Sequence, residues 1–239
     1  MSELQDSQNQ TASMSGVTEA MMREMQLQQE RDRNESKLAE IEKYYKREME
    51  DMGIPYGYRE FTVKTWNPDL QPEIPAGEWR KLWNVAMTGK NLILYSLPFN
   101  EENVGVGIGK SHFTTALLWE RRKRNLWNNP ERFLWLSARS WSMKFSNGGI
   151  QQGEMADRIA SARIVLIDDI GQEGDGKRRL AIADTLAIAH ENETQILGSA
   201  NITREEMGRY YGSAIISRIE GNGDIVGIKG IDLRRTQCV

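Results

Sequence analysis

The sequence has little of what several classes of protein require. Its single cysteine, Cys238, excludes an internal disulfide framework and a zinc site built from cysteines. No apolar run approaches the ~18–20 residues that span a bilayer, and the N-terminus lacks the basic and then apolar pattern of a signal peptide. The formal net charge is only -3, so the chain is not a polycation that coats nucleic acid. We therefore expect a cytoplasmic protein without membrane contact, whose contacts with nucleic acid come from a local basic patch.

The most informative stretch is a glycine-rich loop between an apolar run and a predicted helix. The run Asn91–Ser96 is typical of a buried strand, and His112–Trp119 is typical of a helix. Between them lies Gly105–Ser111, with the sequence GVGIGKS. A strand, a glycine-rich loop, Lys-Ser and a helix follow one another in this order in a phosphate-binding loop. Two features depart from the strict pattern, because Val104 stands where glycine is usual and residues 97–103 lengthen the loop.

This loop offers a nucleotide both hydrogen-bond donors and positive charge. Its glycines let the backbone wrap round a phosphate chain with the N–H groups inward, and the following helix adds its positive end. Lys110 is expected to reach the β- and γ-phosphates, and the Ser111 hydroxyl is expected to bind Mg²⁺. The predicted nucleotide-binding residues are Gly105, Gly107, Ile108, Gly109, Lys110, Ser111 and His112.

A second group of polar residues is expected at the same edge of the sheet. The apolar run Ile164–Ile167 is followed by Asp168 and Asp169, which predicts a buried parallel strand that ends in two acids. Ligands of open α/β sheets lie beyond the carboxyl ends of the strands, so both acids should lie beside the phosphate loop. Asp168 is expected to hold Mg²⁺, and Asp169 to polarise the attacking water. Because Asp169 is shorter than the more usual glutamate, Glu173 is a candidate helper.

The remaining patterns complete an α/β domain with a parallel sheet. Further strands are predicted at Phe133–Leu136, Gln195–Ala200 and Asp224–Ile228, and helices at Glu78–Met87 and Lys177–Glu191. Asn201 follows one of these strands, where a polar side chain can orient water against the γ-phosphate. Thr203 and Glu206 form a capping box that starts another helix. Since no group of His, Cys and carboxylates has metal-ligand spacing, Mg²⁺ with the nucleotide is the only metal expected.

The first 52 residues differ in composition from the rest of the chain. Residues 1–16 are rich in Ser, Gln and Asn, and we expect a disordered tail because so few apolar side chains cannot offset the ordering entropy. In residues 17–52, apolar residues recur at helical spacing among charges, which predicts one or two amphipathic helices. This stripe suits packing on the parent domain, self-association or docking to a partner protein. Residues 53–239 are expected to form the main domain.

Four stretches taken together resemble the bacterial replicative-helicase loaders of the DnaC/DnaI type, within the AAA+ ATPases. They are Gly107–Phe113, Val165–Gly171, Gly198–Asn201 and Ala214–Ile219. The strings GKSH and IDDIG are similar to this family more than to AAA+ proteins at large. The resemblance covers residues 53–236 and implies a three-layer AAA+ P-loop domain with a parallel sheet. It also implies a reduced lid, since only 38 residues follow Asn201.

The resemblance assigns ATP as the nucleotide and implies a role for each matched residue. The first ATP motif would comprise Lys110 and Ser111, the second Asp168 and Asp169, and the polar sensor would be Asn201. Arg218 is similar to the arginine finger, which completes the site of the next subunit, and Arg234 matches the family's last basic position at the nucleotide. A finger that acts in trans requires head-to-tail contacts, which form a ring or a spiral oligomer.

The function that the resemblance implies is ATP-dependent loading of a replicative DNA helicase onto single-stranded DNA, with residues 17–52 holding the helicase. Lys144 and Phe145 are the predicted DNA contacts, because an aromatic beside a cation suits a single strand. Arg178 and Arg179 form a second candidate patch. The small size and the Gln-rich start would suit a phage or prophage version.

Two alternatives remain open. A transposition helper ATPase of the IstB type has a nearly identical core, but its partner would be a transposase and its DNA double-stranded. The other alternative is an adaptor that binds ATP without hydrolysing it. Val104, the lengthened loop and the pair of aspartates favour that second alternative.

Overall fold

The computed structural model describes residues 28, 31, 33, 35–36, 43–71, 74–97, 107–124, 132–146, 150–174, 176–231 and 233. The chain divides into two units, Met1–Arg47 and Glu48–Val239. The described residues of the first unit are all helical, and the tail expected at residues 1–16 lies outside the described part. The second unit contains the sheet and the candidate site.

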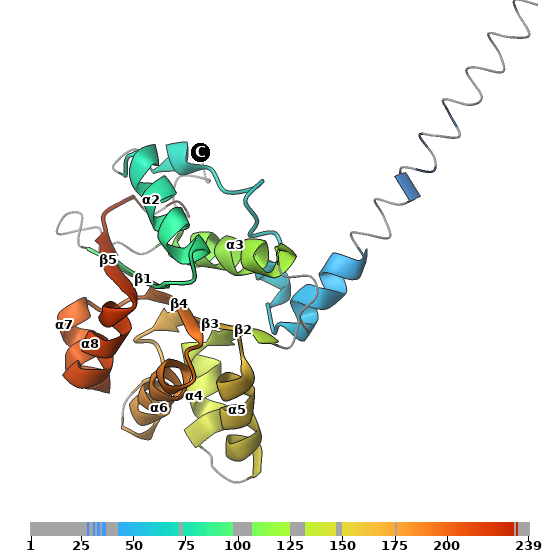
Figure 1. Cartoon of the computed structure of the whole chain (residues 1–239). Helices are drawn as coiled ribbons and strands as arrows, with labels where there is room; N and C mark the ends of the chain where they lie inside the picture. The colour runs from blue at the N-terminus through green and yellow to red at the C-terminus, as the bar shows by residue number, and fades with distance from the viewer. Residues whose placement is uncertain are drawn as a thin grey trace, which may run out of the picture. The chain divides into compact units, whose positions relative to one another are not determined.

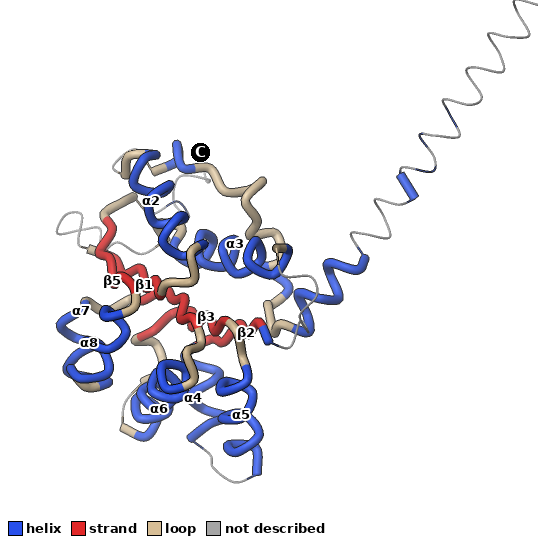
Figure 2. The backbone as a smooth tube through the Cα atoms, in the orientation of Figure 1, coloured by secondary structure: helices blue, strands red, loops and turns tan. Residues whose placement is uncertain are grey.

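In the described part of the second unit, five parallel strands form one sheet (Figure 2). They are β1 (Asn91–Ser96), β2 (Phe133–Ser137), β3 (Ile164–Ile170), β4 (Gln195–Ala200) and β5 (Gly223–Ile228). The order across the sheet is β2-β3-β4-β1-β5, so the predicted closing strand β5 pairs with β1. The central strands are continuous apolar runs because helices cover both of their faces.

Helices form a layer on each face of the sheet (Figure 1). On one face lie α2 (Ala76–Met87) and α3 (Lys110–Lys123), and α3 contacts β2, β3 and β4. On the other lie α4 (Ala138–Ser146), α5 (Ile150–Ser161), α6 (Lys177–Glu191), α7 (Arg204–Tyr211) and α8 (Ser213–Gly221). The structure is therefore the three-layer α/β fold with a parallel sheet that the sequence predicted. None of the described helices is long and apolar enough to cross a membrane.

The start of the second unit is hydrogen-bonded to the edge strand β2. Met49 and Met52 are buried, and the Trp135 N–H donates a hydrogen bond to the Met52 carbonyl over 2.8 Å. The compact unit begins at Glu48, so the last residues of the predicted arm lie within it.

A connecting segment, residues 53–75, then runs towards the start of α3. It contains two short 3₁₀ turns, η1 (Tyr56–Tyr58) and η2 (Pro68–Leu70). Phe61 and Trp66 from this segment pack on His112 in the first turn of α3. The segment thereby forms part of the wall beside the phosphate loop.

Candidate nucleotide-binding site

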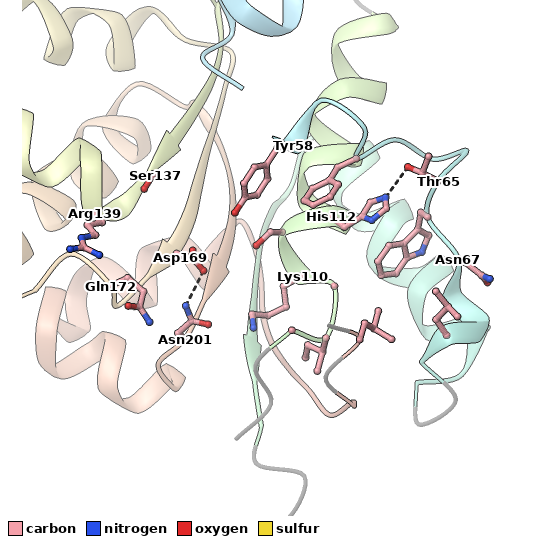
Figure 3. Close-up of a pocket in the computed structure, with 18 residues that line it drawn as sticks. Tyr58, Thr65, Asn67, Lys110, His112, Ser137, Arg139, Asp169, Gln172 and Asn201 are labelled. Carbon is pink, nitrogen blue, oxygen red and sulfur yellow. Dashed lines mark hydrogen bonds between the residues drawn. The ribbon is translucent and has the colours of Figure 1, made fainter. Parts of the chain in front are cut away.

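A cavity of about 580 Å³ lies beyond the carboxyl ends of the strands (Figure 3). One wall comes from the connecting segment and the start of α3, and includes Tyr58, Phe61, Thr65, Trp66, Lys110, Ser111 and His112. The opposite wall comes from the segments that follow β2, β3 and β4, and includes Ser137, Arg139, Asp169, Gln172 and Asn201. The volume falls in the range of small-molecule sites, roughly 300–1,000 Å³.

The described part of the glycine-rich loop has the backbone conformation that a phosphate cradle needs. Gly107 and Gly109 have φ values of 82° and 90°, in the left-handed region that glycine adopts without strain. A Cβ atom on Gly109 would lie 2.9 Å from Cζ3 of Trp66, so a side chain is also excluded by contact. Gly109 caps α3, and the first residues of that helix, Lys110, Ser111 and His112, line the cavity, where a helix N-terminus favours an anion. Gly105 and Val104 lie outside the described residues.

Lys110 is the first residue of α3 and lies where the loop meets the sheet. Its side chain lines the cavity although the residue is only 6% exposed. The ammonium group donates a hydrogen bond to the Ser96 hydroxyl at the end of β1, over 2.5 Å. The predicted strand and the predicted lysine are therefore joined directly, and the cation is held at the floor of the site.

Two adjacent acids at the end of β3 both reach the site because the strand is irregular there. In a regular strand, neighbouring side chains point to opposite faces. The pairing of β3 with β4 shifts between Ile167 and Ile170, and Asp169 has a positive φ of 59°, so the chain bulges at the acids. Asp169 lines the cavity and accepts a hydrogen bond from Nδ2 of Asn201 over 2.9 Å (Figure 3). The predicted acid and the predicted polar sensor are thus in contact.

Asp168 lies below the cavity, beside the serine of the phosphate loop. Burial raises the pKa of its carboxyl group, and the charge of Asp169 raises it further. Hydrogen bonds from Ser199, Ser111 and Tyr58 oppose that rise in pKa, because they stabilise the carboxylate. A serine hydroxyl next to a carboxylate is a donor set that suits Mg²⁺, so Ser111 and Asp168 fit the predicted metal.

Aromatic residues form the wall of the cavity furthest from the acids. The rings of Phe61 and His112 are stacked, with centroids 4.5 Å apart and planes at 9°, and Trp66 meets His112 edge-on. Nε2 of His112 lies 3.1 Å from the Thr65 hydroxyl and 3.2 Å from the Thr62 carbonyl oxygen. Burial lowers the pKa of His112, so the imidazole is neutral near pH 7. The wall is therefore an uncharged aromatic surface that suits contact with a nucleotide base.

The expectation for Glu173 is wrong. The residue is 1% exposed, and its carboxylate accepts hydrogen bonds from the Gly171 N–H over 2.8 Å and from the Tyr211 hydroxyl over 2.6 Å. Both oxygens therefore hold the turn after β3 against α7. The pKa of Tyr211 is raised by burial and by this carboxylate. Glu173 does not line the cavity.

The other predicted residues lie away from the cavity or outside the described part. Arg218 is exposed on α8 and Lys144 is exposed on α4, and neither lines the cavity. Arg234 lies outside the described residues, as does the side chain of Phe145. Conversely, Ser96, Ser199, Arg139 and Gln172 belong to the site and were not assigned to it from the sequence. Arg139 and Gln172 each come two residues after a strand. That position, at the edge of the sheet where the site lies, could have identified them as candidates.

Comparison with known proteins bears on the fold. No protein-family model and no curated protein matches the sequence. Among solved structures, the DnaC helicase loader matches with a TM-score of 0.56 and 14% identity, over 73% of this chain and 100% of that one. DnaI matches with a TM-score of 0.54 and 16% identity, over 74% of this chain and 95% of that one.

A DNA replication initiation factor matches with a TM-score of 0.51 and 19% identity, over 71% of this chain. The match spans 49% of that factor, which is the longer protein. These likenesses establish the fold. The chain shares its three-layer α/β fold with DnaC and DnaI, as its sequence motifs implied.

Proposed function

We propose that this protein is an ATPase of DNA replication initiation that loads a replicative helicase onto single-stranded DNA. The observation that carries the proposal is the meeting of two motifs at one cavity. The start of α3 provides Lys110 and Ser111. The end of β3 provides Asp168 and Asp169, and the residue after β4 is Asn201. The fold adds support, since the neighbours include a helicase loader and a replication initiation factor.

The cavity suggests how ATP would lie. The base would stack on the aromatic wall beside His112, and the phosphates would follow the loop to the N-terminus of α3. Lys110 would neutralise the β- and γ-phosphates. Ser111 and Asp168 would hold Mg²⁺, which neutralises the negative charge that develops on the phosphate oxygens during transfer.

Hydrolysis would take place at the opposite wall. Asp169 would hold and polarise a water that attacks the γ-phosphorus, while the bond to the β-phosphate oxygen breaks and ADP leaves. Asn201 would fix the carboxylate of Asp169 through the hydrogen bond already present. Arg218 would contribute from the neighbouring copy, consistent with its exposed place on α8, away from its own cavity.

Nucleotide binding is the first test. We expect Lys110→Ala to abolish binding of a fluorescent ATP analogue, since the site loses its buried cation. Lys90→Ala is the matched control, because that lysine is exposed and does not line the cavity. Equal affinities for Lys110→Ala and the unmodified chain would refute the nucleotide site.

Helicase capture tests the partner. A chain that lacks residues 1–42 removes most of the arm and spares Glu48, Met49 and Met52, which are buried in the second unit. We expect this chain to keep its thermal unfolding midpoint and its nucleotide affinity, and to lose capture of purified replicative helicase. Unchanged capture would show that residues 17–42 of the arm do not dock the helicase. Capture of a transposase in place of the helicase would favour the IstB-type alternative.

A further inference from the structure

A single buried hydroxyl joins the two acids of the site. Ser199, on β4, is completely buried. Its Oγ donates a hydrogen bond to Oδ1 of Asp168 over 2.5 Å and accepts one from the backbone N–H of Asp169 over 3.0 Å. The Ser111 hydroxyl lies 3.5 Å away, at the outer limit of hydrogen bonding. Every group that Ser199 contacts here therefore belongs to the candidate metal and water site.

The contact with the Asp169 N–H replaces a bond of the sheet. The ladder between β3 and β4 is regular up to Ile167, shifts there, and continues where the Asn201 N–H donates to the Ile170 carbonyl over 2.9 Å. The N–H of Asp169 falls inside that shift and finds a side-chain acceptor. A backbone donor that is shielded from water within a sheet needs such a partner, because leaving it unsatisfied destabilises the fold.

The same contact bears on the conformation of Asp169. A positive φ is unfavourable for a residue other than glycine, and it persists only where the surroundings hold it. Here the N–H is held by Ser199 and the carboxylate by Asn201, so the residue is fixed at both ends. Without the bulge, Asp168 and Asp169 would point to opposite faces of the sheet.

We propose that Ser199 is a positioning residue, whose one hydroxyl fixes the bulge of β3 and orients Asp168 towards Mg²⁺ and Asp169 towards the cavity. The inference rests on the proposed function, since it assigns Ser199 to the same ATP site. A serine suits this position because its hydroxyl can donate to one group while it accepts from another. An alanine would remove one of the three hydroxyl donors of Asp168 and would leave the N–H of Asp169 without the acceptor that it has here.

The test compares three variants. Ser199→Ala removes the hydroxyl and Ser199→Thr restores one. Ser142→Ala is the matched control, because Ser142 is equally buried and donates to the Arg139 carbonyl in α4. Amide hydrogen exchange of the Asp169 N–H is measured in the nucleotide-free protein. The Mg²⁺ dependence of binding is measured with a non-hydrolysable ATP analogue, which is independent of turnover.

We expect faster exchange of the Asp169 amide in Ser199→Ala alone, with other amides of β3 unchanged. The Mg²⁺ concentration for half-maximal binding should rise by about 10- to 100-fold, as for the loss of other groups that orient metal ligands. Ser199→Thr should recover towards the original values, and Ser142→Ala should match them.

The two measurements test separate parts of the inference. Unchanged exchange and unchanged Mg²⁺ dependence in Ser199→Ala would overturn the inference, and faster exchange with unchanged Mg²⁺ dependence would overturn its metal part. If the unmodified chain binds no nucleotide, the proposed function fails. The exchange experiment still decides whether Ser199 holds the bulge, because it needs no ligand.

Discussion

Arg122, in the last turn of α3, and Glu48 form an ion pair in which both side chains are almost completely buried, at 1% and 4% exposure. The guanidinium also lies over the Phe133 ring of β2, 5.6 Å from its centroid. Because α3 begins at Lys110, one helix joins the phosphate loop to the first residue of the compact unit. The pair therefore connects the end of the predicted arm to the candidate site through a single rigid element.

Breaking this pair should destabilise the protein strongly. We expect Glu48→Gln to lower the free energy of unfolding by about 3–5 kcal/mol, since it leaves the charge of Arg122 without its buried counter-ion. Glu50→Gln is the control, because its contact with Arg59 is 3.8 Å long and the Glu50 side chain is 70% exposed. That change should cost less than about 1 kcal/mol. Equal losses in urea unfolding would show that the buried pair contributes no more than a surface pair.

His112 should make stability depend on pH. Burial lowers its pKa below the ordinary value of 6.5, so the folded state binds fewer protons than the unfolded state between those two values. Stability is therefore full above pH 6.5 and is lost as the pH falls through and below that value. His112→Phe keeps a flat ring beside Phe61 and should flatten this part of the pH profile, while His190→Phe should retain it. An unchanged pH profile in His112→Phe would contradict the assignment of this loss of stability to His112.

The elements that the sequence predicted best are those set by local pattern. The strands Asn91–Ser96 and Gln195–Ala200 and the helix Lys177–Glu191 have the predicted bounds, because apolar runs and helical spacing are properties of neighbouring residues. Helix α5 was not predicted. Among its residues with a described side chain only Ile159 is fully buried, so the apolar period is weak.

The site was predicted only in part for a similar reason. Motif spacing placed Lys110, Asp169 and Asn201 at one edge of the sheet, as parallel strands require. The bulge that brings both acids to the site could not be predicted, because the apolar run before them has the pattern of a regular strand. Ser199 and Tyr58 contribute single hydroxyls whose partners come from other elements of the fold. Glu173 was misplaced because its partner, Tyr211, is distant in the sequence and close in space.

Asp169 should separate an ATPase from a non-hydrolysing adaptor. Asp169→Asn keeps the shape of the side chain and removes the charge that polarises water. We expect nucleotide affinity to stay within about threefold, and the single-turnover hydrolysis rate to fall by about 10²–10⁴-fold, the usual contribution of a positioned base. If the unmodified chain and the variant hydrolyse ATP at the same background rate, the adaptor is the better description.

Binding to single-stranded DNA should depend on α4. Lys144 is exposed there, and Phe145 follows it in the same helix. We expect Phe145→Ala to weaken binding of an oligonucleotide by about 1–3 kcal/mol through lost stacking. Lys144→Ala should reduce the salt dependence of binding by about one phosphate contact. Loss of binding in Arg178→Ala/Arg179→Ala, with α4 variants unaffected, would move the DNA site to the start of α6.

Arg218 offers a test of assembly. The residue is exposed on α8 and does not line its own cavity, so a role in hydrolysis requires a second copy. Arg218→Ala should bind nucleotide normally and lose about 10³–10⁵-fold in hydrolysis rate, as expected for an arginine finger. Arg209→Ala, on the neighbouring helix α7, is the control and should hydrolyse normally. Mixing Arg218→Ala with Asp169→Asn should restore part of the activity, because some interfaces in mixed assemblies then combine an intact Asp169 with an intact Arg218. A mixture no more active than either variant alone would show that Arg218 acts within its own subunit or not at all.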